Sequence, residues 1–203
     1  MTIEKGKPWG IEVTRPSDLQ LADSDQVVAH LLTADVGAPV APTSGDLHRT
    51  IGARPLDDRL LLVEFPIDLL RVRLDDERET TAVAHVTVQS PSWSGGWWRG
   101  PVLMVMNAQF LGDWHVVSRG HPNDGRAESV EWGSEFGLRQ RWEARRRLPT
   151  GGHVPHPAIE TRSFRERSWT FDRSLDVCID GRRSGRARSL QIVVEPDAAV
   201  VYG

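Results

Sequence analysis

The sequence predicts a mainly β protein that opens with a small α/β segment and continues as an antiparallel β-sandwich. Three observations favour this fold class. From Leu60 onward, seven or more runs rich in Val, Leu and Ile follow one another at short spacing. Asp180-Gly181 and Pro196-Asp197 mark tight turns between the last of these runs. A single helix near residues 134–148 interrupts the strand pattern, and we expect it to be exposed on the sandwich.

Residues 1–55 are predicted to form the α/β segment. Residues 1–20 are expected to be extended chain and turns, because prolines and glycines interrupt any regular pattern there. Ser24 or Asp25 can cap a short helix over Gln26–Leu32. The loop from Pro42 to Gly52 leads into a helical turn that begins near Asp46.

Residues 56–203 are predicted to form the sandwich domain. Pro101–Met106 is a continuous apolar run, which is typical of a strand buried on both faces. The helix over Ser134–Leu148 has Ser134 as its expected cap, and Pro149 with Gly151 ends it. The other predicted strands are Leu60–Phe65, Asp68–Leu74, Ala82–Val88, Ala158–Phe164, Ser168–Phe171, Leu175–Asp180, Ser189–Glu195 and Ala199–Tyr202.

Composition excludes several classes of protein. The net charge of −3 argues against a nucleic-acid binder that depends on bulk positive charge. Cys178 is the single cysteine, so no internal disulfide can form, and its apolar surroundings predict a buried thiol. No stretch approaches the roughly 18 apolar residues of a membrane span, and the N-terminus has no apolar signal region. We therefore expect a cytoplasmic protein.

Six segments, in the same order along the chain, resemble the C-terminal half of the bacterial diacylglycerol kinase-like lipid kinases. Within the first, Pro42, Asp46, Arg49 and Gly52 fit the Pro-x-Gly-Thr-x-Asn-Asp loop and the helix after it. The segments are residues 41–52, 66–72, 102–112, 121–126, 177–182 and 189–200. The resemblance implies the fold of the C-terminal domain of the NAD kinase/diacylglycerol kinase-like proteins, over roughly residues 35–203.

The same resemblance implies that much of the kinase chemistry is missing. The family's Gly-Gly-Asp-Gly-Thr nucleotide loop is absent from this sequence, and residues 1–34 are too few to rebuild that half of the enzyme. A structural Mg²⁺ in the family is held by two aspartates of an Asp-x-x-Asp-Gly turn. Here Asp124 matches the second and His121 replaces the first, so Asp124 is the candidate metal ligand, or the cap of a tight turn. Arg182 replaces the glutamate that serves as the family's base, and a guanidinium cannot accept a proton.

We therefore expect a non-catalytic relative of these kinases that binds a ligand or partner. The ligand would be a small anion, a nucleotide or a lipid headgroup, because arginine suits phosphate and carboxylate. A loop of small residues before the Asp46 helix could also offer N–H groups to phosphate. The polar side chains expected at the site are Asp46, His48, Arg49, His121, Asn123 and Asp124.

Two other classes of function remain open. The chain could be a kinase subunit completed by another chain or by homodimerisation, with Trp93, Trp97 and Trp98 as interface residues. Alternatively, those tryptophans fold over the core. An independent hydrolase that uses His121 and Asp124 ranks last, because no nucleophile sits in a recognisable elbow.

The pair His153 and His156 has a spacing that two zinc ligands can adopt, but no third ligand is suggested.

Overall fold

The computed structural model describes residues 9–57, 59–154 and 156–203. Within these ranges the chain is mainly antiparallel β-structure with few helices, which confirms the coarse fold class. The N-terminal elements are β1 (Ile11–Thr14), β2 (Gln20–Ala22), α1 (Asp25–Ala34), β3 (Val40–Pro42) and α2 (Asp46–Ile51). The extended chain predicted for residues 1–8 lies outside the described residues.

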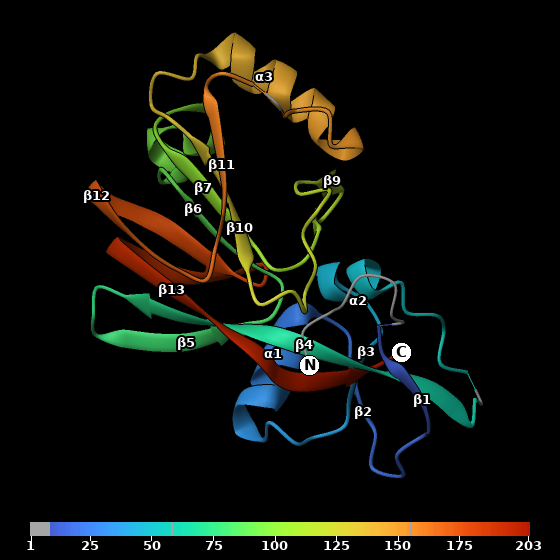
Figure 1. The fold of residues 1–203 in the computed structure, drawn as a ribbon. Coiled ribbons are helices and arrows are strands. Elements are labelled where there is room, and N and C mark those ends of the chain that lie inside the picture. The colour runs from blue at the N-terminus through green and yellow to red at the C-terminus, as the bar shows by residue number, and fades with distance from the viewer. Residues whose placement is uncertain (1–8, 58, 155) are drawn as a thin grey trace.

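The remaining elements build the rest of the sheet and the helix that lies at its far end (Figure 1). They are β4 (Leu61–Leu74), β5 (Arg78–Ala82), β6 (His85–Gln89), the 3-10 turns η1 (Ser92–Ser94) and η2 (Gly96–Trp98), β7 (Val102–Met106), β8 (Phe110–Leu111), β9 (Trp114–His115), β10 (Ala127–Trp132), α3 (Leu138–Arg147), η3 (Leu148–Thr150), β11 (Ile159–Phe164), β12 (Glu166–Ile179) and β13 (Arg182–Tyr202).

One path of hydrogen bonds joins the large sheet in the order β1-β4-β13-β12-β6-β7-β10-β11 across the described residues. The sheet is strongly bent, so β6, β7, β10 and β11 rise away from β4, β5 and the C-terminal end of β13 (Figure 1). Its neighbouring strands along this path are antiparallel. A two-layer sandwich and a domain boundary near residue 55 stay predictions.

The N-terminal segment contains a small parallel unit, of which the sequence predicted the helix but not the two short strands. Strands β2 and β3 are parallel neighbours, in register from Gln20 opposite Val40, and α1 connects them. Strand β3 also pairs in parallel with β13, through Val40 and Val201. The helix buries Val28 and Leu32 against this part of the sheet. The turn from β2 into α1 is therefore a strand-to-helix turn of the kind that often binds phosphate.

Several predicted strands prove to be parts of longer ones. Leu60–Phe65 and Asp68–Leu74 are one strand, β4, which runs through Pro66. Pro66 lies opposite Val200, next to an irregularity in β13, where the missing N–H of proline is tolerated. The predicted strands 168–171 and 175–180 likewise form one strand, β12, and those at 189–195 and 199–202 lie in one strand, β13. In each case the pairing is irregular between the two predicted parts, since a bulge bends a strand without ending it. Conversely, the predicted strand Ala82–Val88 is interrupted by Val83 and Ala84.

The predicted helix begins one turn later than expected. Helix α3 starts at Leu138, where the Gln140 side chain accepts the Gly137 N–H at 3.0 Å, so Ser134 is not its cap. The apolar run Pro101–Met106 does form a strand, β7, that is buried on both faces. No helix in the described part of the chain is both long enough and apolar enough to cross a membrane.

Candidate functional site

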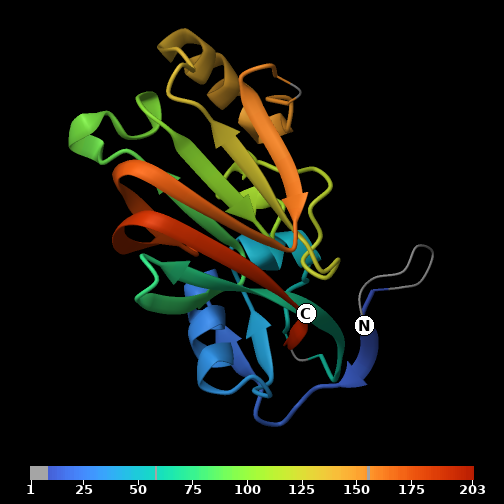
Figure 2. The same cartoon turned by 60° about the vertical axis from the view of Figure 1, so that its left-hand side comes forward.

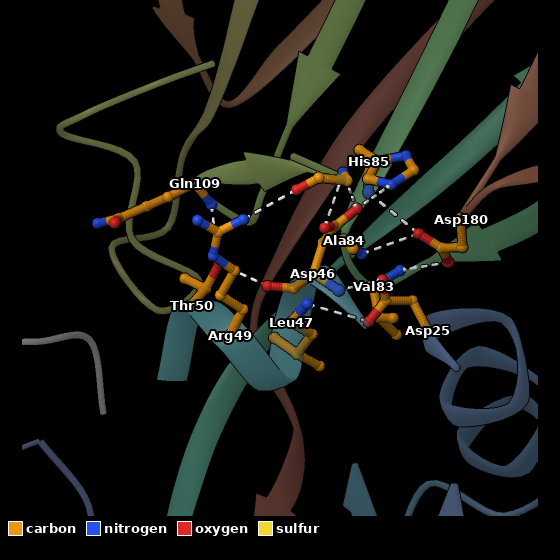
Figure 3. A network of polar contacts seen from close by, with 11 residues as sticks. Asp25, Asp46, Leu47, Arg49, Thr50, Val83, Ala84, His85, Gln109 and Asp180 are labelled. Atoms are coloured by element: carbon orange, nitrogen blue, oxygen red, sulfur yellow. Dashed lines mark hydrogen bonds and ion pairs between the residues drawn. The ribbon is translucent and has the colours of Figure 1, made fainter. Parts of the chain in front are cut away.

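A buried cluster of charged side chains lies where α1, α2, β6 and the β12–β13 turn meet (Figure 3). Its members are Asp25, Asp46, His85 and Asp180. The Nε2 atom of His85 lies 2.9 Å from Oδ2 of Asp46, in an ion pair whose two side chains are almost fully covered. Four segments that are distant in the sequence therefore converge on one small volume.

Asp25 is the first residue of α1, but its carboxylate caps a different helix. It accepts the backbone N–H groups of Asp46 at 2.7 Å and Leu47 at 3.0 Å, which are the first two of α2. Gly45 before them has φ 103°, and a Cβ there would lie 2.5 Å from Oδ1 of Asp25. Only glycine fits so close to this carboxylate in that conformation. The N–H groups at the N-terminus of α2, which could have been offered to phosphate, are bound by the protein's own carboxylate.

Asp180 holds the segment between β5 and β6 in a similar way. Its carboxylate accepts N–H groups from Val83 at 2.9 Å, Ala84 at 2.9 Å and His85 at 3.0 Å. Asp180 and Gly181 both have positive φ values, 47° and 79°, as the expected tight turn between β12 and β13 requires. The turn places the carboxylate under the backbone that presents His85.

Burial and pairing set the protonation of this cluster. Burial raises the pKa of Asp25 to about 6, despite the two N–H groups that it accepts. Burial also raises the pKa of Asp180. For His85, burial alone lowers the pKa, but the hydrogen bond to Asp46 and the nearby carboxylates outweigh it and hold the pKa above its ordinary value. The pKa of Asp46 is lowered, since His85 and the N–H of Gly112 outweigh the effect of burial.

The cluster can hold a proton or a cation better than an anion. One ligand atom each from Asp25, Asp46 and His85 lie within 4.8 Å of one another, and in the described part of the chain they form the one group of this kind. Their oxygens and Nε2 are already engaged in internal hydrogen bonds. A phosphate would meet several carboxylates here, and like charges repel.

A change of pH should reveal the ionisation of Asp25. Its pKa of about 6 in the folded protein lies above the ordinary value of 3.8. Its contribution to the free energy of unfolding is therefore full below about pH 4 and is lost as the pH rises through 6. The contribution that is lost amounts to roughly 3 kcal/mol. We expect the free energy of unfolding of wild type, minus that of Asp25→Asn, to fall by about this amount between pH 4 and 7 in urea titrations.

The comparison with Asp25→Asn is needed because the titration of His153 changes the free energy of unfolding in the opposite direction. Burial, and then the nearby His115, lower the pKa of His153 to about 4, so that its neutral form favours the folded state as the pH rises. This contribution is common to wild type and Asp25→Asn and cancels between them. A difference that stays constant across the pH range would contradict the assignment to Asp25.

The predicted ligand residues on α2 bind the protein's own β8–β9 turn. Oδ1 of Asp46 accepts the N–H of Gly112 at 2.9 Å, and Arg49 donates to the carbonyl of Gly112 at 3.0 Å. The Arg49 guanidinium also lies 3.8 Å from the centre of the Phe110 ring. His48 is half-buried on the same helix. Two of the three candidates on this helix therefore already have internal partners.

The predicted residues of the 121–125 turn gather around Asp68, in a second network. Asp68 is fully buried and accepts the N–H groups of Gly125 at 2.6 Å and Asp197 at 2.9 Å. Asn123 donates to the Asp197 carboxylate at 2.9 Å. His121 accepts the Asn123 N–H at 3.2 Å and packs edge-on against Trp9. This network differs from the one around Asp46, although buried Asn107 links the two by donating to the carbonyls of Asp68 and Val83.

The turn fits Mg²⁺ poorly. Oδ1 of Asp124 accepts the Arg126 N–H at 3.0 Å, which is the capped tight turn that the sequence allowed as an alternative. His121 brings an imidazole in place of the first carboxylate, and Mg²⁺ prefers oxygen. Metal binding by Asp124 stays a prediction.

The candidate zinc pair has no third ligand nearby. His153 is buried, and His156 accepts the Ala158 N–H at 3.1 Å. No group of three possible ligands within the described ranges includes either histidine.

Sequence reasoning missed the roles of Asp25 and His85. His85 is the one ionisable side chain in the run from Ala82 to Val88, which is otherwise apolar except for Thr87, and that contrast was the available signal. Asp25 was expected only as a cap for its own helix, and nothing local indicates that its carboxylate reaches α2. Asp180 was expected in a turn, and the structure adds its three N–H partners.

A cavity of about 940 Å³ opens beside this cluster, between α1, the β4–β5 hairpin and the β12–β13 turn. Figure 2 shows the tips of these two hairpins at the same edge of the molecule, with α1 below them. Its charged lining is mixed, because Arg78, Arg182, Arg183 and His30 share it with the carboxylates of Glu77 and Glu79. Asp180 lines it too, so the cavity and the buried cluster share a wall.

Comparisons with known proteins show similarity at the level of structure. No protein-family model matches the sequence, and no curated protein matches it. Three solved structures, of diacylglycerol kinases or proteins described as such from Bacillus anthracis str. Sterne, each match 91% of this chain. They are 12%, 11% and 12% identical, with TM-scores of 0.61, 0.67 and 0.66, over 75%, 77% and 77% of their own lengths. At such low identity the match establishes the fold: this chain is folded like the diacylglycerol kinase-like proteins.

Proposed function

We propose that this chain is a non-catalytic relative of the diacylglycerol kinase-like proteins that binds a small anionic ligand. The capping of α2 by Asp25 carries the first half of the proposal. Phosphoryl transfer depends on positioned phosphates and on neutralised charge around them. Here the turn from β2 into α1 reads Asp23-Ser24-Asp25, and the Asp25 carboxylate accepts the N–H groups of Asp46 and Leu47 at the start of α2. Such a site disfavours ATP.

Arg182 supports the same conclusion from the other side of the cluster. The resemblance places it where the kinases carry their base, next to Asp180 in the β12–β13 turn. An arginine stays protonated and cannot remove a proton from a lipid hydroxyl. Asp180 is a poor replacement, because three backbone N–H groups already bind its carboxylate.

The cavity next to Asp180 is the proposed ligand site. Its volume of about 940 Å³ lies within the range of small-molecule sites. Arg182 projects from the turn that lines it, and Arg78 is held nearby by the carbonyls of Ser184 at 3.1 Å and Arg186 at 2.8 Å. Fixed guanidinium groups suit a phosphate or carboxylate ligand. The same position that lost a base would thus have gained a cation.

An assay of the purified chain tests both halves. With radiolabelled ATP, Mg²⁺ and diacylglycerol we expect no turnover above the protein-free background. By calorimetry we expect ADP or inorganic pyrophosphate to bind, and Arg182→Glu to weaken that binding about tenfold or more, since it reverses a charge at the site. Arg54→Glu reverses an exposed charge on a different part of the chain and is the matched control.

The alternative, a kinase subunit completed by another chain or by a second copy, makes a different prediction. It requires turnover to appear when the missing component is added, or to rise with protein concentration as dimers form. Robust turnover by the pure chain at any concentration would overturn the non-catalytic assignment. If neither ADP nor pyrophosphate binds, the ligand site is wrong, and the proposal that the chain is non-catalytic is unaffected.

A further inference from the structure

Strands β6, β7, β10 and β11 form one side of a second cavity, of about 580 Å³. The register of these strands places Val88, Leu103, Glu131 and Glu160 opposite one another in a row across the sheet. All four residues line the cavity, so this side is apolar at one end and acidic at the other. Within the described residues, the cavity shares no lining residue with the proposed anion site.

Strand β12 adds aromatic side chains to this cavity. It begins one residue after β11 ends, and its Trp169 ring packs edge-on against Phe164 of β11, with 5.5 Å between the ring centres. Trp169, Phe171 and Leu175 line the cavity. Phe171 is half-buried, so part of its ring can still be covered by a ligand. The volume lies within the range of small-molecule sites.

Arginine side chains balance the charge of the two opposed glutamates. Like charges directly opposite on neighbouring strands are unfavourable. Nη1 of Arg167 lies 2.7 Å from Oε1 of Glu131, and its Nη2 lies 3.7 Å from Oε1 of Glu160. Glu160 also pairs with Arg162. The carboxylates are therefore held in place and largely neutralised, yet each has further lone pairs that can accept hydrogen bonds.

Two tryptophans that line the cavity have an indole N–H without an acceptor. Trp132 is 2% exposed and Trp169 is 9% exposed, and Nε1 of each has no hydrogen-bond partner among the described residues. Trp97 packs edge-on against Trp132, whereas Trp93 and Trp98, the other predicted interface residues, stay exposed. A buried donor is normally paired. Two unpaired donors in the lining of one cavity point to an acceptor that a ligand brings.

We propose that this cavity binds a neutral sugar ring, as a free hexose or as the end unit of a glycan. A hydroxyl group donates and accepts, so the hydroxyls of one ligand can pair with both the carboxylates and the indole N–H groups. The C–H face of a sugar ring packs on an aromatic ring such as that of Phe171. An anion would meet Glu131 and Glu160, and a cation would leave the N–H groups unpaired. A third glutamate, Glu135, is exposed, and the nearby Arg141 offsets its charge.

Saturation-transfer NMR on the whole chain tests the proposal. The probes are glucose, galactose, mannose and N-acetylglucosamine, each also as its methyl glycoside. We expect at least one of them to bind with a dissociation constant of about 10 mM or lower. Binding of the free sugar alone would assign a free hexose. Binding of the methyl glycoside as well would assign the end unit of a glycan, since the anomeric oxygen is then substituted.

Two substitutions each remove one kind of contact. Trp169→Phe keeps an aromatic ring but removes the N–H, and should weaken binding about fivefold or more, as expected for the loss of one hydrogen bond. Phe171→Ser removes the half-buried ring and should weaken binding to a similar extent. The matched controls are Trp93→Phe and Asp172→Ala, at exposed residues that do not line the cavity, and both should bind like wild type. Circular dichroism checks that each variant is folded.

The sugar site is wrong if none of these probes binds to the wild-type chain. It is also wrong if Trp169→Phe and Phe171→Ser both bind a sugar as tightly as wild type does. Binding of choline without any sugar would contradict it as well, because the site would then recognise charge instead of hydroxyl groups. Arg182→Glu should bind sugar normally, so failure at this cavity and failure at the proposed anion site can be told apart.

Discussion

Replacing Arg141 with methionine should lower the free energy of unfolding by about 3–5 kcal/mol. Methionine can fill much of the same space, but it donates no hydrogen bond. Four backbone carbonyls that Arg141 now satisfies would be left in a largely buried region. Each orphaned polar group costs part of its desolvation energy. Urea unfolding, followed by circular dichroism, measures the change.

Arg147 provides the control for this substitution. It lies on the same helix but is exposed, so Arg147→Met should change stability by less than about 0.5 kcal/mol. Comparable losses for the two variants would mean that Arg141 contributes as a generic helix residue. The Trp97–Gly100 loop would then need another explanation for its fixed position.

Replacing Asp180 with alanine should have an effect of similar size, about 3–5 kcal/mol. The change leaves the N–H groups of Val83, Ala84 and His85 without their acceptor in the core of the molecule. Asp180→Asn keeps one oxygen and should cost less. Thermal or urea unfolding at neutral pH gives the comparison.

Asp172 is the matched control because it is an exposed aspartate on the same strand, β12. Asp172→Ala should be within about 0.5 kcal/mol of wild type. Hydrogen exchange gives a second readout: in Asp180→Ala the amides of residues 83–85 should lose protection while those of β7 keep theirs. Retained protection at residues 83–85 would show that the Asp180 carboxylate does not hold this segment.

The local signals in the sequence were sufficient for strands, turns and one helix. Continuous apolar runs and Asp-Gly turns depend on residues close together in the chain, and β7 and the β12–β13 turn follow from them. Element boundaries were less accurate. The N-terminus of α3 depends on Gln140 and on where Arg141 finds carbonyls, and Pro66 is accepted within β4 only because its partner strand is irregular there.

The parallel β2–α1–β3 unit shows why the N-terminal segment was underestimated. Its two strands have three residues each, too few for any periodic pattern. The sequence predicted a short α/β segment there, but it gave no strand on either side of the helix. The structure shows a strand–helix–strand unit and puts Asp23, Ser24 and Asp25 in its first turn.

The sequence by itself determined the β-rich class of this protein, because hydrophobic runs and turn residues act over short distances. Its motifs also indicated the likeness to the diacylglycerol kinase-like fold. Only the tertiary structure decided which carboxylate meets which N–H. Asp25, Asp46, His85 and Asp180 are brought together by strand pairing across the whole chain. An aspartate can cap a helix, pair with a histidine or be available to bind a ligand, and its neighbours in space decide which. Those neighbours are set by the register of strands that are far apart in sequence.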